Sequence, residues 1–260
     1  MLTDSWGWRA AFGILVIDHD PVAEAEFWAM APAGVAVNAA RFASPRRPGT
    51  SEYGDQARVV AESPDIARGL DCFGGMRLDA ICVCFTTSSF LGGAEFDKAF
   101  AEQASVRAQG IPALTAAQAT VAAMDAVGMT APYVLVPPWF KDEIVAAGRE
   151  YLTAAGFPPV AMDRLDVGGD LRPWELWDAG AQWEVRPEQV YHQIRRAIPA
   201  GADGVVIAGN GLRCVDTIGP LEADLGLPVV TSNQACLWHC LRTARVDPAA
   251  VLGYGRLFTA

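Results

Sequence analysis

The stretch Gly204-Val-Val-Ile-Ala-Gly-Asn-Gly-Leu-Arg-Cys-Val-Asp-Thr-Ile218 joins an apolar run of strand length to a helix. The run ends in Gly209-Asn-Gly211, and apolar side chains then recur with helical spacing from Val215 onward. In a parallel α/β sheet, such a junction exposes backbone N–H groups at the start of a helix, where an anion can bind. The stretch therefore predicts both a fold class and a place for a ligand.

Strand-like and helix-like segments alternate along the rest of the chain, as in a parallel sheet built from βαβ units. Before the quoted stretch, the expected strands are residues 12–17, 35–42, 78–85, 110–114, 133–136 and 160–165. The expected helices are residues 23–29, a helix within 53–70 that begins near Asp55, and residues 94–108, 116–127, 141–155 and 187–198. The pattern predicts an α/β fold.

An internal repeat refines this prediction. Gly110-Ile-Pro-Ala-Leu-Thr-Ala-Ala-Gln-Ala119 recurs as Gly226-Leu-Pro-Val-Val-Thr-Ser-Asn-Gln-Ala235, and two further pairs of strand ends keep a similar offset, Asp20 with Trp139 and Phe85 with Gly209. Gly-x-Pro before a buried strand also recurs in unrelated α/β proteins, but three pairs in one order favour duplication. We therefore expect two pseudo-symmetric parallel-sheet α/β halves, residues 1–115 plus 230–260 and residues 116–229, with the active site between them.

Composition excludes several classes of partner. The 260 residues carry a formal charge of −10 and have a pI near 4.7, so no basic face is expected for nucleic acid or an anionic membrane surface. No apolar run approaches the roughly 20 residues of a membrane span, and residues 1–9 lack signal-peptide features. The six cysteines show no CxxC spacing, which favours buried reduced thiols over disulfides or a metal site. A soluble cytoplasmic protein is expected.

Four stretches carry a resemblance to a known family: residues 13–26, 81–90, 209–218 and 225–239. Through them the chain resembles, nearly end to end, the aspartate/glutamate racemase superfamily, and specifically its maleate cis-trans isomerase and arylmalonate decarboxylase branch. The resemblance implies a cofactor-independent enzyme that acts on a small carboxylate. A homo-oligomer is also expected.

The resemblance also implies a set of ligand-binding residues. Family members hold a carboxylate in a nest of backbone N–H groups and hydroxyls, which here corresponds to Thr86, Thr87, Gly209, Asn210, Gly211 and Asn233. Asp20 stands where the family usually has Asn, and Trp139 where it usually has Tyr. On the residues alone, the same glycines and asparagine are equally compatible with an ordinary strand-to-helix turn.

Both cysteines of the family pattern are missing. Aligned without gaps, the first falls on Phe85 and the second on Gly209, whereas Cys84 lies one residue early and Cys214 five residues late. A thiolate can exchange an α-proton or add to a double bond, and a helix N-terminus is expected to lower the pKa of Cys214. Cys84 and Cys214 are therefore catalytic candidates, although free cysteines are usually small core hydrophobes.

Acid–base groups offer an alternative to thiol chemistry. Asp20 and His19 lie on the first loop beside Asp18, and His239 lies in the helix after Asn233. A carboxylate near an imidazole can activate water or shuttle a proton, which suits hydration, hydrolysis or decarboxylation. For His239, a hydrogen-bonded structural role is the competing interpretation.

Apolar residues shape the expected substrate. Phe85 and Trp139 predict a cleft that accepts a hydrocarbon or aromatic group, while Arg41 and Arg213 are weak candidates for a second carboxylate. The Trp-rich segment 167–183 is predicted to form a lid or an oligomer contact, or else a satellite cluster under a long loop.

Three functional classes remain open. The preferred one is an isomerase or decarboxylase-type lyase that forms an enediolate or carbanion beside a carboxylate. The alternatives are a cysteine-free hydratase or hydrolase and a non-catalytic carboxylate-binding protein, because fold alone does not choose among them.

Overall fold

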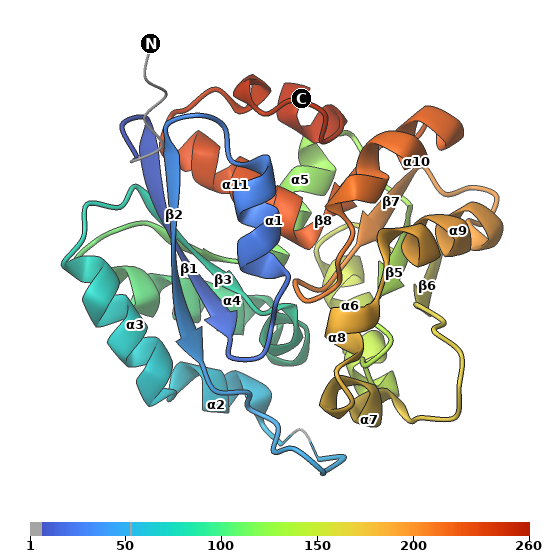
Figure 1. Cartoon of the computed structure of the whole chain (residues 1–260), viewed down its shortest axis with the longest axis horizontal. Coiled ribbons are helices and arrows are strands. Elements are labelled where there is room, and N and C mark those ends of the chain that lie inside the picture. Colours follow the sequence, from blue (N-terminus) through green and yellow to red (C-terminus); the bar gives the residue numbers. More distant parts are fainter. Residues whose placement is uncertain (1–6, 53) are drawn as a thin grey trace.

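The computed structural model describes residues 7–52 and 54–260, and two parallel four-stranded sheets form its frame (Figure 1). The first sheet has the order β2-β1-β3-β4 and the second β6-β5-β7-β8. The strands are β1 (Ala10–Ile17), β2 (Val35–Phe42), β3 (Ala80–Cys84), β4 (Ala113–Thr115), β5 (Pro132–Val136), β6 (Ala161–Arg164), β7 (Gly204–Ile207) and β8 (Val229–Thr231). Each strand has a counterpart at the same place in the other sheet, and the predicted two-half α/β fold is confirmed.

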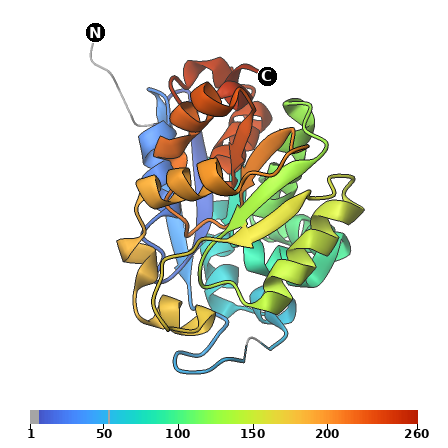
Figure 2. The ribbon, with the colours of Figure 1, turned by 90° about the vertical axis from the view of Figure 1, so that its right-hand side faces the viewer.

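Helices cover both faces of the two sheets, as Figure 2 shows for the second half. They are α1 (Ala23–Met30), α2 (Gln56–Ala61), α3 (Pro64–Gly74), α4 (Thr86–Arg107), α5 (Ala116–Ala126), α6 (Asp142–Ala154), α7 (Pro173–Asp178), α8 (Ala181–Glu184), α9 (Pro187–Ala197), α10 (Ile218–Leu225) and α11 (Ser232–Thr243). Short 3-10 helices occupy Val215–Thr217, Pro248–Ala250 and Arg256–Thr259. No helix within the described ranges is long and apolar enough to cross a membrane.

Strand β1 shows why both faces of a sheet are covered. Ile14 and Val16 point into one buried apolar cluster, and Leu15 and Ile17 into another on the opposite face. Successive strand side chains point to opposite faces, so a strand that is apolar at every position needs helices on both sides. The apolar run, rather than an alternating pattern, is therefore the signal for a parallel sheet.

The internal repeat corresponds to two equivalent strand-to-helix units. Thr115 and Gln118 form a capping box at the start of α5, and Thr231 and Gln234 form the same capping box at the start of α11. Helices α5 and α11 also pack against each other. The last strand of the first sheet, β4, ends at Thr115, and the last strand of the second sheet is β8. The predicted division of the helices between the two halves stays a prediction.

Two predicted helices differ from the structure. The single helix expected within residues 53–70 is two helices, because Ser63 caps a new helix whose first residue is Pro64, and proline cannot continue the preceding one. The helix expected from residue 94 begins at Thr86 and bends at Gly93, whose φ of 76° is non-helical. Residues 1–6 and Tyr53 lie outside the described residues. The signal-peptide prediction rests partly on residues 1–6.

Candidate active site

A cavity of about 60 Å³ lies at the carboxyl ends of the strands, between the two halves. This is the position where ligands bind in parallel α/β sheets. Its walls come from the segments after β1, β2, β3, β5 and β7, together with α2, α6 and α7. It is lined by Ile17, Asp20, Ser44, Arg46, Gln56, Cys84, Phe85, Thr86, Thr87, Pro137, Trp139, Phe140, Ile144, Trp177, Gly209, Asn210 and Gly211.

The predicted anion nest forms one wall of this cavity. Helix α4 begins at Thr86 and Thr87 without a side-chain cap, and the first N–H groups of a helix have no intrahelical acceptor. Opposite them, Asn210 and Gly211 come from the second half. The N–H of Gly209 is already used, since it donates to Ser232 Oγ at 3.0 Å, so Gly209 shapes the nest without offering its donor.

A buried hydrogen-bond network fixes Asn210. Thr86 Oγ1 donates to Asn210 Oδ1 at 2.9 Å, and Asn210 Nδ2 donates to Asn233 Oδ1 at 2.8 Å. Asn233 Nδ2 in turn donates to the Asn210 carbonyl at 2.9 Å and to Glu26 Oε2 at 2.7 Å. Asn233, predicted to bind substrate, therefore lies behind the cavity wall and positions Asn210.

Sequence reasoning missed Glu26. Its Oε1 accepts the backbone N–H groups of Cys214 and Val215 at 2.7 and 3.0 Å, so this carboxyl connects α1 to the loop after β7. The signal was present in the sequence, because Glu26 falls on the same helical face as Ala23, Phe27 and Met30, all buried. An acidic residue on an apolar face indicates a buried partner.

Two buried carboxyl groups in this region have raised pKa values. Burial raises the pKa of Asp20 to about 6, although the N–H groups of Val22 and Ala23 and the charge of Arg41 act in the opposite direction. Burial also raises the pKa of Glu26 to about 7, against its three N–H donors. Asp20 lines the cavity, so it can hold or release a proton there near neutral pH.

The two candidate cysteines lie in different places. Cys84 lines the cavity, and its hydrogen bonding with Cys236, together with burial, raises its pKa. Cys214 is buried behind the wall and precedes a short 3-10 helix. The expected lowering of the Cys214 pKa is wrong: burial, and then the nearby Glu26 carboxyl, raise it well above its usual value.

Neither candidate histidine lines the cavity. The His19 side chain is 72% exposed and pairs with Asp18 at 3.0 Å, so it points to solvent rather than toward Asp20. His239 is partly buried on α11, where burial lowers its pKa. The structure therefore does not assemble the carboxylate–imidazole pair that the sequence indicated.

The Trp-rich segment, residues 167–183, contributes one wall of the cavity through α7. Trp177 lines it and packs edge-on against Trp139, with ring centroids 5.2 Å apart. The next residue, Asp178, forms an ion pair with the buried Arg46 and also accepts the N–H of Gly49. This segment is therefore joined to the loop after β2, and both lie at the lower edge of the molecule in Figure 1.

The predicted second-carboxylate residues lie elsewhere. Arg41 pairs with Glu24 and donates to the carbonyls of Ile17 and Asp20, while Arg213 is exposed and outside the cavity. Instead, Gln56 lines the cavity, is 1% exposed, and has both side-chain amide atoms without a hydrogen-bond partner among the described residues.

Comparison with known proteins agrees with this fold. The sequence profile of the arylmalonate decarboxylase family matches residues 52–258, and the chain belongs to this family. It is 29% identical over 202 residues to the arylmalonate decarboxylase of Bordetella bronchiseptica, covering 77% of this chain and 78% of that protein. The predicted resemblance to the maleate isomerase and arylmalonate decarboxylase branch is thus confirmed.

Solved structures show the same fold. The maleate isomerase of Pseudomonas putida S16 superposes with a TM-score of 0.80 at 18% identity, over 96% of this chain and 98% of that one. A Nocardia farcinica maleate cis-trans isomerase with a covalently bound succinylcysteine intermediate gives a TM-score of 0.77 at 19% identity, over 96% and 98% of the two chains. At these identities, the solved structures show a shared fold.

Proposed function

We propose that this protein is a cofactor-independent decarboxylase or proton-transfer isomerase that acts on a small dicarboxylate in the cavity between its halves. The observation that carries the proposal is the placement of an anion nest, at Thr86, Thr87 and Gly211, in the same cavity as the buried acid Asp20. The nest suits the negative charge of an enediolate, and Asp20 supplies a proton beside it.

The nest acts by stabilising developing charge. The uncapped N–H groups at the start of α4 are fixed before the substrate arrives, so they need little reorganisation as charge moves onto the substrate carboxylate. The Thr86 hydroxyl already donates to Asn210 Oδ1 and holds the shape of the nest. Removal of one such donor typically costs about 2.7–4 kcal/mol of transition-state stabilisation.

Asp20 is the proposed proton carrier. In decarboxylation, the bond to the departing carboxylate breaks, carbon dioxide leaves, and the electron pair forms an enediolate that takes the Asp20 proton at carbon. Solvent then reprotonates Asp20. In an isomerisation, the Asp20 carboxylate removes an α-proton and delivers it to a different carbon of the delocalised anion, because return to the same carbon and face would regenerate the substrate. A pKa of about 6 leaves both protonation states accessible near neutral pH.

This assignment differs from a two-cysteine mechanism for a structural reason. At Gly209, the φ of 109° and the Pro137 ring, whose Cγ lies 2.6 Å from the position of a β-carbon, leave no room for a cysteine side chain. Within the described chain, Asp20 and Cys84 are the acidic side chains that line the cavity. The raised pKa of Cys84 keeps it a neutral thiol, which supports Asp20 as the main proton carrier.

Gln56 supports the choice of a dicarboxylate. Its buried amide has no partner in the described residues, and Arg46, which is paired with Asp178, lines the same cavity. A buried polar group without a partner is costly, and a ligand carboxylate with an ordered water would satisfy it. We assign the second carboxylate of the substrate to this end.

The size of the cavity limits the substituent that the dicarboxylate substrate can carry. An engineered cavity of about 150 Å³ is large enough for benzene, whereas this one measures about 60 Å³. A phenyl group therefore needs more additional room beside Trp177 than a small alkyl group does, so small alkyl substituents are preferred over the aromatic group that Phe85 and Trp139 suggested.

The test is a panel of malonates with hydrogen, methyl or phenyl substituents, together with maleate, incubated in deuterated water and followed by NMR. Decarboxylation with deuterium at the α-carbon is expected for the small malonates. Asp20→Asn should lower the rate at least about 100-fold, at the low end for a lost acid–base group. Asp18→Asn, which changes a partly exposed neighbour outside the cavity, should not. A hydroxylated product from maleate would instead indicate a hydratase, and unchanged activity of Asp20→Asn would reject Asp20 as the proton carrier.

A further inference from the structure

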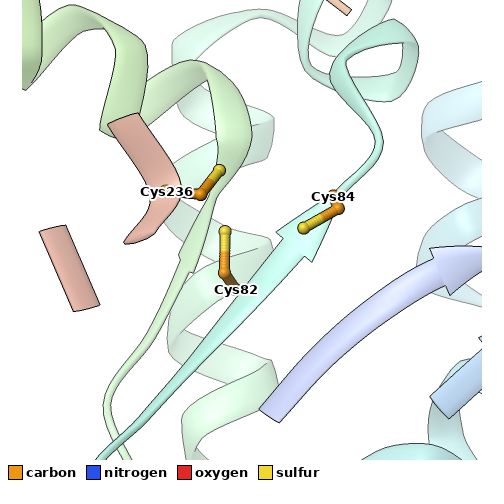
Figure 3. Close-up of side chains that lie close together, drawn as sticks. All are labelled: Cys82, Cys84 and Cys236. Atoms are coloured by element: carbon orange, nitrogen blue, oxygen red, sulfur yellow. The ribbon is translucent and has the colours of Figure 1, made fainter. Parts of the chain in front are cut away.

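Three buried thiols converge beside the cavity. Cys82 and Cys84 lie on β3 and Cys236 lies on α11, and their Sγ atoms are all within 4.8 Å of one another. Figure 3 shows the three side chains lying close together. This thiol cluster (Cys82, Cys84 and Cys236) is at most 1% exposed.

Local geometry explains the convergence. Residues two apart in a strand point to the same face, so Cys82 and Cys84 both face α11, which packs against β3. There Cys236 Sγ lies 4.0 Å from Asn210 Nδ2, a residue of the nest. Cys84 also lines the cavity, which gives a small ion a route to the cluster.

We propose that the thiol cluster is a binding site for a thiophilic divalent ion, Zn²⁺, held by the sulfurs of Cys82, Cys84 and Cys236. A tetrahedral ion about 2.3 Å from each sulfur requires sulfur–sulfur separations of about 3.8 Å. The Sγ atoms are up to 4.8 Å apart, and side-chain shifts of about 1 Å or less would bring them to this separation.

Charge favours zinc over a monovalent ion such as Cu⁺. Binding releases the thiol protons to solvent, and three thiolates then leave a net charge of −1 with Zn²⁺ but −2 with Cu⁺. Since an uncompensated charge is costly in a dry interior, the smaller residual charge is preferred. With three protein sulfurs, zinc keeps its fourth position for water, as in open zinc sites.

The ligands come from two elements that pack together, Cys82 and Cys84 from β3 and Cys236 from α11. Sequence spacing gave no metal motif because the third thiol comes from a helix far along the chain.

The test uses chelator-treated full-length protein titrated with Co²⁺ and then Zn²⁺. We expect one Co²⁺ per chain, with thiolate charge-transfer absorption that Zn²⁺ abolishes. We expect the affinity for Co²⁺ to fall more than about 100-fold in each of the variants Cys82→Ala, Cys84→Ala and Cys236→Ala. Loss of a residue that only supports a metal ligand already lowers metal affinity roughly 10–100-fold. Cys72→Ala and Cys240→Ala, which change thiols outside the cluster, should bind normally.

A second measurement covers variants that fail to fold. Wild-type protein loaded with Zn²⁺ is alkylated under native conditions, and the sites are mapped by mass spectrometry. Zinc should slow modification of the three cluster thiols and leave the exposed Cys72 unchanged. No charge-transfer band, or equal protection of Cys72, would overturn the proposal. Neither readout depends on carboxylate turnover, so this inference and the proposed activity fail separately.

Discussion

Thr86 Oγ1 donates a 2.9 Å hydrogen bond to Asn210 Oδ1, and this buried contact joins the first turn of α4 to the loop after β7. It therefore connects the two halves of the molecule inside the anion nest. Loss of this bond affects the shape of the nest as well as stability, because Asn210 is held by Thr86 on one side and Asn233 on the other.

The substitution Thr86→Val keeps the side-chain shape and removes the donor. We expect a loss of about 1–2 kcal/mol in the free energy of unfolding, and weaker dicarboxylate binding by calorimetry. Thr120→Val is the matched control, since Thr120 Oγ1 donates to the Ala116 carbonyl at 2.8 Å inside α5, away from the cavity. Equal affinities in the two variants would contradict a nest role for Thr86.

Asp20 makes stability depend on pH with a definite sign. Because its pKa is about 6 in the folded protein and 3.8 ordinarily, the folded state holds a proton that the unfolded chain releases between these values. Stability contributed by this group is therefore greatest below about pH 4 and is lost as the pH rises to about 6, by up to about 3 kcal/mol.

Asp20→Asn should remove this contribution. Its free energy of unfolding, from urea titrations across pH 4–8, should rise relative to wild type as the pH increases through this window. Glu26, whose pKa is also raised, keeps its own pH dependence in both proteins, so only the difference between them is diagnostic. A constant difference at every pH would mean that the Asp20 carboxyl is not buried as the structure shows; Asp18→Asn provides the baseline.

Two glycines in the same loop should respond differently to a β-carbon. At Gly209, the φ of 109° and a 2.6 Å approach to Pro137 Cγ make any side chain strained. Gly209→Ala should destabilise the fold by roughly 1–3 kcal/mol, and Gly209→Cys should not restore thiol chemistry. At Gly211, a β-carbon meets Trp139 and Trp177 at 3.4 Å and Asp20 Oδ2 at 3.6 Å, which are ordinary contacts.

Gly211→Ala should therefore unfold at nearly the wild-type temperature while its methyl group occupies the cavity and weakens ligand binding. Thermal melts and calorimetry on the two variants separate a structural role from a ligand-facing one. If Gly211→Ala bound ligand as wild type does, the substrate would lie elsewhere.

The fold was predictable because it depends on local patterns. Apolar runs indicated buried parallel strands, and the repeated segments that contain Thr115 and Thr231 indicated two equivalent halves, in which each copy forms a capping box. Cavity residues that directly follow strands, such as Thr86 and Gly211, were predictable for the same reason. A strand end sets the position of the next few residues.

Features that depend on side-chain direction or on distant segments were not predictable. His19 follows a strand as Asp20 does, yet it points to solvent while Asp20 turns inward to accept the Val22 N–H. Gln56 and Cys236 reach the region of the site from helices whose docking no local pattern specifies. Periodicity gives a residue's face but not the neighbour it meets.

Trp177 should control the size of the substrate. It lines the cavity and contacts Trp139, and α7 is linked to the rest of the protein through the Asp178–Arg46 ion pair. Trp177→Ala removes an indole from a cavity of about 60 Å³ and should raise the affinity for phenyl-substituted malonate relative to the methyl compound. Because Trp177 is partly exposed, the stability loss should be below the roughly 3–5 kcal/mol of a fully buried tryptophan.

The matched control is Trp174→Ala on the same helix. Trp174 stacks under the Arg172 guanidinium at 4.6 Å and does not line the cavity, so its loss should leave the phenyl-to-methyl preference unchanged. Calorimetric titration of both ligands into both variants gives this ratio directly. A shift in Trp177→Ala alone means that α7 limits substrate size. An equal shift in both variants means that loosening the helix, rather than opening the cavity, admits the larger ligand. If the ratio is unchanged in both variants, the substituent binds away from the tryptophan pair.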